Sequence, residues 1–319
     1  MKLKIPGTGS PDPTVDDGDP AEIQGRGPWQ LAWARLRHDR VAVISGITIV
    51  GIVLVAIFAP VVAHLTGHSP FTQYRTTGLS PEGIPVGPGR NFLLGTDSLG
   101  RDILVRVCYG TRISLLAGVV ASSLAVAVGV VVGLTAGFFG GAVDTVLART
   151  MDAVLSLPYL VLAIALISVV GPSLLVSIAV IAFFSFSSVG RIVRGQVLSI
   201  KEKEFIEAAR SLGAGNLRIM FVDILPNVLA PVIVYLTLLV PASIVFEATL
   251  SFLGLGVVPP TPSWGGMLSE STAWYQVAWW YVLVPGLGLL VTTLAFNLLG
   301  DSVRDAFDPR YNRLFVSES

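Results

Sequence analysis

Six stretches of mostly apolar residues dominate this chain, and they constrain its fold more than any other feature. A helix that crosses a bilayer needs roughly 20 such residues in a row. The stretches cover residues 41–64, 113–139, 158–171, 173–190, 228–253 and 277–299. The sequence therefore predicts an all-α integral membrane protein with six transmembrane helices.

The third and fourth stretches are short, and Gly171 and Pro172 separate them. Together they would exceed the thickness of a bilayer if they formed one helix. Because a Gly-Pro pair favours a turn, we expect two helices joined by a hairpin at 171–173.

Composition narrows the function classes. The 319 residues are 53% hydrophobic and 13% charged, whereas a soluble domain carries about 25% charged residues. The formal net charge is zero, so no basic field suggests nucleic acid as a partner. One cysteine and three histidines, outside any His-Glu-x-x-His pattern, predict no disulfide framework, no metal site and no cofactor.

Lys and Arg residues predict the orientation, because they gather on the cytoplasmic side of membrane proteins. Residues 1–40 hold six of them, 191–226 hold six and the C-terminal tail holds three. With six spans these segments share one side, so we expect both termini in the cytoplasm. The 65–112 loop is then extracytoplasmic although it carries five arginines. Residues 1–28 are rich in Pro, Gly and Asp and read as a disordered cytoplasmic tail, not as a signal peptide.

The polar segment before the fifth stretch has the pattern of a docking surface. One helix face from residue 201 onward is apolar but shallow, because alanines occupy its centre, and the opposite face carries mixed charges that include Glu207. Gly213 fits a helix C-terminus in a left-handed conformation, and Asn216 is the expected N-cap of a second helix. Pro226 is expected to end that helix or to open the next span. The two predicted apolar stripes are Phe205, Ala208, Ala209 and Leu212, then Leu217, Met220, Phe221 and Ile224.

An alternative for this segment is a helix that lies on the lipid surface. Such helices usually combine bulky apolar faces with basic polar faces. The alanine-centred face and mixed charge favour docking to a soluble protein.

The same segment resembles the signature of the membrane-spanning permease subunits of bacterial ABC importers. That signature is Glu-Ala-Ala, three residues, Gly, nine residues, then Ile-x-Leu-Pro. The matching residues are Glu207, Ala208, Ala209, Gly213, Leu225 and Pro226, whereas Asp223 stands in place of the isoleucine. Residues 95–102 and 250–265 further resemble the branch that serves dipeptides, oligopeptides or nickel.

The resemblance implies the permease fold of type I ABC importers and a set of partners. The partners would be a homologous second permease subunit, cytoplasmic ATPase subunits, an extracytoplasmic substrate-binding protein and the lipid bilayer of the bacterial cytoplasmic (inner) membrane. It implies that residues 29–112 form the first helix and an outer loop, 113–300 a five-helix core with the coupling segment 199–226, and 301–319 a cytoplasmic tail. The chain would not itself be an enzyme. It has no Gly-x-x-x-x-Gly-Lys-[Ser/Thr] stretch, so ATP would be hydrolysed on separate subunits.

Single residues suggest further sites. Glu247 is the acid within the apolar stretches, so it could gate or line the path, or it could lie at the outer interface and cap the segment that follows. Asp97, Arg101 and Asp102 are expected to form a local ion-pair cluster. Gly129, Gly133 and Gly137 form a stripe for close helix packing, within the chain or with a second subunit. Four tryptophans are expected at the outer membrane interface: Trp264, Trp274, Trp279 and Trp280.

These features favour an importer subunit for short peptides. The alternative in the same class moves nickel or another small solute. A passive channel would not need the cytoplasmic segment. An intramembrane enzyme would need a nucleophile and a base within the spans, which contain no lysine and no paired acids.

Overall fold

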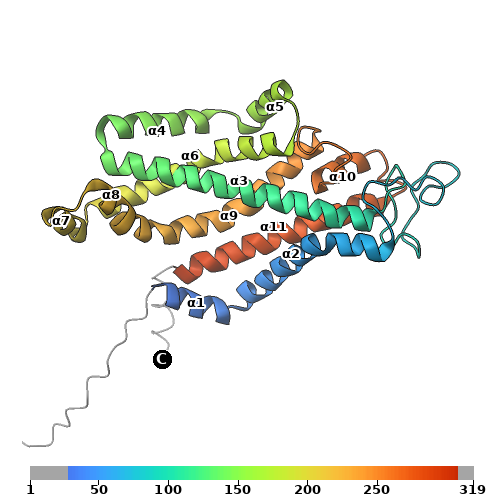
Figure 1. The fold of residues 1–319 in the computed structure, drawn as a ribbon, viewed down its shortest axis with the longest axis horizontal. Helices are drawn as coiled ribbons and strands as arrows, with labels where there is room; N and C mark the ends of the chain where they lie inside the picture. Colours follow the sequence, from blue (N-terminus) through green and yellow to red (C-terminus); the bar gives the residue numbers. More distant parts are fainter. Residues whose placement is uncertain (1–27, 308–319) are drawn as a thin grey trace, which may run out of the picture.

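Long helices run side by side along the molecule (Figure 1). The computed structural model describes residues 28–307, and the regular elements in that range are all helical. Five of its helices are long and apolar enough to cross a membrane. They are α2 (Arg40–Thr66), α3 (Ile103–Phe139), α6 (Leu174–Lys201), α9 (Leu225–Phe252) and α11 (Trp279–Phe307).

The third predicted span differs from the expectation. The stretch 158–171 forms only α5 (Tyr159–Val170), whose 12 residues extend about 18 Å at 1.5 Å per residue, less than the roughly 30 Å of a bilayer core. An additional helix, α4 (Gly141–Ser156), precedes it with a bend of 88° at the break. Residues 28–307 therefore contain six spans only if α4 and α5 together make one crossing. In Figure 1 α4 runs back beside α6, which agrees with a single crossing by the pair.

Charged residues explain why the hydropathy pattern missed α4. Asp144 accepts a hydrogen bond from Arg194 Nη2 at 2.7 Å, and Asp152 accepts one from Arg191 Nη2 at 2.5 Å. These ion pairs connect the polar face of α4 to α6. The predicted break at 171–173 is confirmed, because α5 ends at Val170 and α6 begins at Leu174, with the Ser173 hydroxyl accepting from Val176 N.

Short helices lie at the two ends of the bundle. One end carries α1 (Pro28–His38), the C-terminal end of α11, and α7 (Glu204–Ser211) with α8 (Asn216–Arg218). The opposite end carries the 67–102 loop and α10 (Trp264–Ser271). The predicted tail at 301–319 begins inside α11, which continues to Phe307. The rest of that tail, and nearly all of the predicted tail at 1–28, lie outside the described residues.

The glycine stripe of α3 packs inside the chain. A Cβ on Gly129 would lie 2.5 Å from Val189 Cβ, one on Gly133 would lie 2.4 Å from the Gly190 oxygen, and one on Gly137 would lie 2.7 Å from Val197 Cβ. Hydrogen in place of a side chain therefore lets the α3 and α6 backbones approach. The packing within one chain is confirmed as the role of this stripe.

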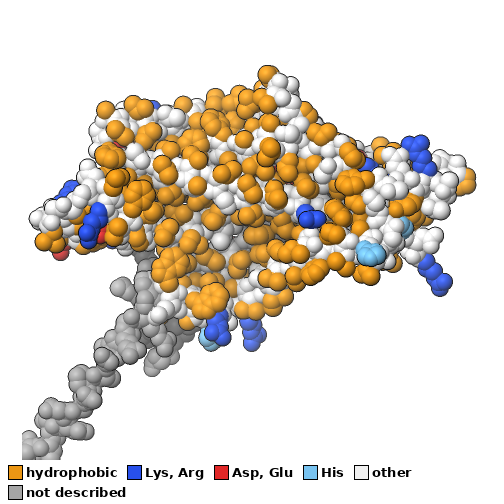
Figure 2. Space-filling view, in the orientation of Figure 1, with side chains coloured by type: hydrophobic (Ala, Val, Ile, Leu, Met, Phe, Trp, Pro, Cys, Tyr) orange, Lys and Arg blue, Asp and Glu red, His pale blue; other side chains and the backbone are white. Residues whose placement is uncertain are grey.

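Exposure separates core helices from peripheral ones. In the most apolar 18-residue part of α6, 56% of the residues are buried, whereas the share is 17% in the corresponding parts of α2 and α11. Figure 2 shows a flank covered by hydrophobic side chains, with most of the visible Lys and Arg toward the ends. The rest of the described chain therefore leaves the α2 and α11 side chains uncovered over much of their length.

The tryptophan prediction holds only in part. Trp279 is exposed, but Trp264 is fully buried, and Trp280 donates its indole N–H to the Thr96 oxygen at 3.2 Å. Packing at the loop-bearing end of the bundle, not an interfacial position, explains those two residues.

Candidate functional site

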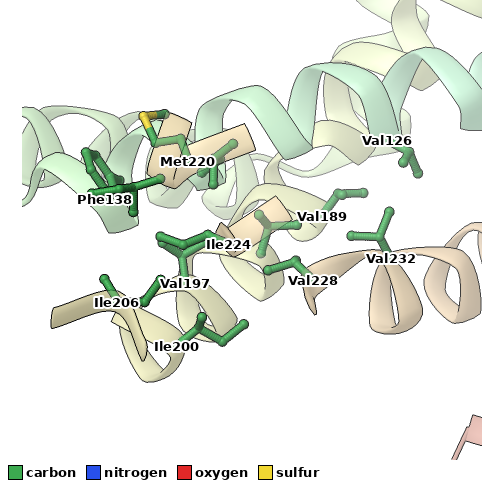
Figure 3. Close-up of a cluster of buried hydrophobic side chains, with 13 residues drawn as sticks. Val126, Phe138, Val189, Val197, Ile200, Ile206, Met220, Ile224, Val228 and Val232 are labelled. Atoms are coloured by element: carbon green, nitrogen blue, oxygen red, sulfur yellow. The ribbon is translucent and has the colours of Figure 1, made fainter. Parts of the chain in front are cut away.

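The candidate site is the predicted coupling segment, and one buried side chain fixes its first helix. Ile206 of α7 is fully buried. It packs into the hydrophobic cluster that joins α3, α6, η1 and α9, beside Val197 and Ile200 (Figure 3). The predicted apolar face did not include Ile206. Its spacing of three residues from Ala209, which is half-buried against the same cluster, is the sequence signal for this second face.

Three of the four residues of the predicted apolar face of α7 point away from the molecule, whereas the fourth, Ala209, packs against the hydrophobic cluster. Phe205 is 43% exposed and Leu212 is 87% exposed, and Ala208 between them is also exposed. Glu207 is exposed in the first turn, where a carboxylate is favourable beside the helix N-terminus. Two large apolar side chains flank a small one, so a second surface can approach the α7 backbone closely at Ala208.

The end of α7 follows the prediction for Gly213, which has φ +82°. Gly213 N donates to the Arg210 oxygen at 2.9 Å, and Ala214 N donates to the Ala209 oxygen at 3.0 Å. These two bonds form a Schellman motif, which requires a left-handed residue at this position. The prediction for Asn216 is wrong: Gly215 is the N-cap and Asn216 is the first residue of α8.

A π-helix, η1 (Ile219–Ile224), changes the second predicted stripe. Met220 and Ile224 are buried as a helical stripe predicts, but Leu217 is 69% and Phe221 is 54% exposed. The wider turn rotates Ile219 inward instead. Leu217 and Phe221 are therefore two more exposed apolar side chains of the coupling segment.

Pro226 gives a local reason for the wide turn. It stands in the first turn of α9, as expected if it opens the span, and it has no N–H to donate to the preceding turn. The residue before the proline, Leu225, donates its backbone N–H to the Met220 oxygen, five residues back, as in a π-helix. The Asn227 side-chain amide donates to the Asp223 oxygen at 2.7 Å, so that carbonyl is satisfied. We give the name docking face to the exposed apolar side chains of this segment, which are Phe205, Ala208, Leu212, Leu217 and Phe221.

Glu247 lies inside the chain. Its carboxylate is fully buried and accepts hydrogen bonds from the Ser114 hydroxyl at 3.1 Å and the Ser251 hydroxyl at 2.6 Å. Ser114 also accepts from Trp264 N at 3.4 Å, and Ser251 accepts from Val257 N at 3.1 Å. The carboxylate thus links α3, α9 and the segment leading to α10. A role as a gate or in the path stays a prediction, because in this conformation Glu247 lines no exposed surface.

The predicted ion-pair cluster is confirmed for Asp97 and Arg101 and is wrong for Asp102, and it includes two residues that were not predicted. Arg101 Nε donates to Asp97 Oδ2 at 2.5 Å. Arg101 and Arg106 both donate to Glu270 Oε2, at 2.7 and 3.0 Å. Asp102 pairs with His68 at 2.6 Å, not with Arg101. Arg106 and Glu270 were missed, since Glu270 lies 169 residues from Arg101 and only the fold brings them together.

The fold, with its apolar helices and an anchored α7, is that of a multi-pass membrane subunit of the type I ABC importer class. Structures of the MetNI methionine ABC transporter in inward-facing conformations match it with a TM-score of 0.52 and 19% identity, over 63% of this chain and 96% of that chain. Residues 129–313 match the binding-protein-dependent transport system inner membrane component family, and residues 27–81 match the N-terminal transmembrane domain of oligopeptide transport permease C.

Three curated relatives share most of their length with the chain. The dipeptide transport system permease protein DppC of Haemophilus influenzae is 42% identical over 91% of this chain and 98% of its own. The di/tripeptide permease protein DppC of Pseudomonas aeruginosa is 41% identical over 89% and 92%. The glutathione permease protein GsiD of Escherichia coli is 39% identical over 90% and 92%. The chain belongs to the family of binding-protein-dependent transport system inner membrane components.

Proposed function

We propose that this chain is the membrane-spanning subunit of an ATP-driven importer for short peptides. It forms half of the translocation path and receives the ATPase through the 199–226 segment. A homologous permease forms the other half, and an extracytoplasmic binding protein delivers the substrate. The observation that carries the proposal is the docking face, an exposed apolar surface held in place by the buried Ile206.

The relatives support peptides over nickel as the substrate. The three relatives reported above are named for dipeptides, di/tripeptides and glutathione, and each of these molecules carries amide bonds and a free carboxylate. A passive channel would not need the anchored α7. ATP hydrolysis by a partner subunit agrees with a chain that contains no P-loop sequence.

Uptake by the assembled importer tests this function. We expect proteoliposomes that contain both permease subunits, the ATPase subunits and the binding protein to accumulate a labelled dipeptide only with ATP. The matched control is the chain reconstituted alone, which should neither hydrolyse ATP nor take up dipeptide. Uptake or ATP hydrolysis by the chain alone would refute the subunit role, and accumulation of Ni²⁺ without dipeptide would refute the substrate class.

We further propose that α7 faces the cytoplasm and the 67–102 loop faces outside. The five arginines of residues 65–112 argue against this orientation, because Lys and Arg gather on the cytoplasmic side of membrane proteins. Two of them, Arg101 and Arg106, are buried in ion pairs with Asp97 and Glu270. Because these charges are neutralised within the fold, the loop presents less positive charge than its sequence suggests.

Labelling of single cysteines measures the orientation. The native Cys108, which is buried, is first replaced by alanine, and cysteine is then placed at the exposed Thr76 or Ser199. We expect an impermeant thiol reagent to label Thr76→Cys in intact cells and Ser199→Cys only after the membrane is opened. Labelling of Ser199→Cys in intact cells would reverse the topology.

A further inference from the structure

Helix α1 has one face packed on α11. Ala32 is buried, Arg35 Nη1 donates to the Ala306 oxygen at 3.0 Å, and Trp29 meets Phe307 edge to face at 5.1 Å between ring centroids. A hydrogen bond from Ser302 lowers the pKa of Asp39, the residue that links α1 to α2. Residues 32, 35 and 39 recur at helical spacing, so this face is fixed against the end of α11.

The opposite face of α1 is exposed in the part of the chain that the structure describes. Trp33 is 65% exposed, and Arg37, four residues later, is exposed on the same side. Arg40 is exposed at the start of α2, directly after the break in the helix at Asp39. Helix α1 contains no acidic residue. The acids near it, Asp301 and Asp305, lie on α11 and line the cleft on the inner side of α1.

The position of this face relative to the membrane follows from the residues at the start of α2. The first exposed apolar side chains of α2, Val41, Val43 and Ile44, begin directly after Arg40. Because α2 is apolar enough to cross a membrane and is little covered by the rest of the described chain, we infer that its hydrocarbon-facing part starts there, with Arg37 and Arg40 at its edge. Arginine with an amphipathic tryptophan is the combination that suits the level of the lipid headgroups.

We propose that the face formed by Trp33, Arg37 and Arg40 binds the headgroups of anionic phospholipids. The two guanidinium groups receive lipid phosphates, and the Trp33 ring rests between headgroup and acyl chain. The face is continuous with the lipid-facing surface of α2, and its charge is complementary to an anionic membrane. That the lipids belong to the inner leaflet rests on the proposed orientation, whereas headgroup binding does not.

The test compares two charge-matched double variants of the assembled complex in nanodiscs with equal parts of phosphatidylglycerol and phosphatidylcholine. Native mass spectrometry counts the lipids that the complex retains. We expect the wild type to retain phosphatidylglycerol preferentially. Arg37→Gln with Arg40→Gln should weaken that preference about fivefold for each arginine removed. Arg75→Gln with Arg90→Gln, two exposed arginines of the 67–102 loop, should leave it unchanged.

Equal retention of both lipids by the wild type would overturn the proposal, as would an equal loss in the two double variants. A photoreactive phenylalanine analogue at position 33 gives a second measurement. We expect an adduct with phospholipid. An adduct with another polypeptide alone would assign the face to a protein partner. None of these readouts depends on uptake, so a failure of the proposed function leaves the lipid test intact.

Discussion

Replacing Gly133 with leucine should greatly reduce the amount of folded protein that accumulates in the membrane. A Cβ at this position would lie 2.4 Å from the Gly190 oxygen and 3.0 Å from Arg194 N, both of which are backbone atoms of α6. Backbone of a packed helix cannot yield as a flexible side chain does, so α3 and α6 must separate. Overpacking of a well-packed core commonly costs about 1–3 kcal/mol, and the backbone contacts place this site at or above the upper end.

The measurement is the amount of folded protein in detergent extracts, followed by fluorescence-detected size exclusion. Gly195→Leu is the matched control, because Gly195 lies on α6 directly after Arg194 and a Cβ there meets nothing within 4 Å. We expect the control to accumulate like the wild type. Normal accumulation of Gly133→Leu would mean that α3 and α6 do not pack as described.

The apolar pattern predicted the long helices that can cross a membrane and missed α4, whose acidic side chains pair within the protein. The long apolar stretches gave α2, α3, α6, α9 and α11 with errors mainly at their ends. Helix α4 was missed because Asp144 and Asp152 interrupt its apolar pattern, and their partners on α6 lie 50 and 39 residues away. A one-dimensional pattern carries no record of such partners.

In the coupling segment too, the sequence predicted some features and not others. Gly213 was predictable, since the need for a left-handed residue is local. The exposure of Leu217 and Phe221 was not, because a regular helical period was assumed and the π-helix shifts the register at Ile219. Ile206 was missed because α7 has two apolar sides, and only the tertiary structure shows which one is buried.

Replacing Gly213 with valine should leave the protein in the membrane but remove most of the transport. Gly213 has φ +82°, and a Cβ there meets nothing within 4 Å. The penalty is therefore confined to the backbone, and a left-handed conformation costs an L-residue roughly 1–2 kcal/mol. That free energy is too small to unfold the bundle, but it corresponds to about a 5- to 30-fold loss of the correctly placed docking face.

Gly215→Val is the matched control for this prediction. Gly215 lies two residues away, is equally open to solvent, and has φ −73°, which valine adopts without strain. Uptake and substrate-stimulated ATP hydrolysis by the assembled importer should fall about tenfold for Gly213→Val, within the range set by the strain, and stay near wild type for Gly215→Val. Glu207→Ala should also have a small effect, because an exposed charge pair contributes about 0–1 kcal/mol. If Gly213→Val transported normally while Glu207→Ala abolished transport, a specific ionic contact through Glu207, not the placement of an apolar face, would connect this subunit to the proposed ATPase partner.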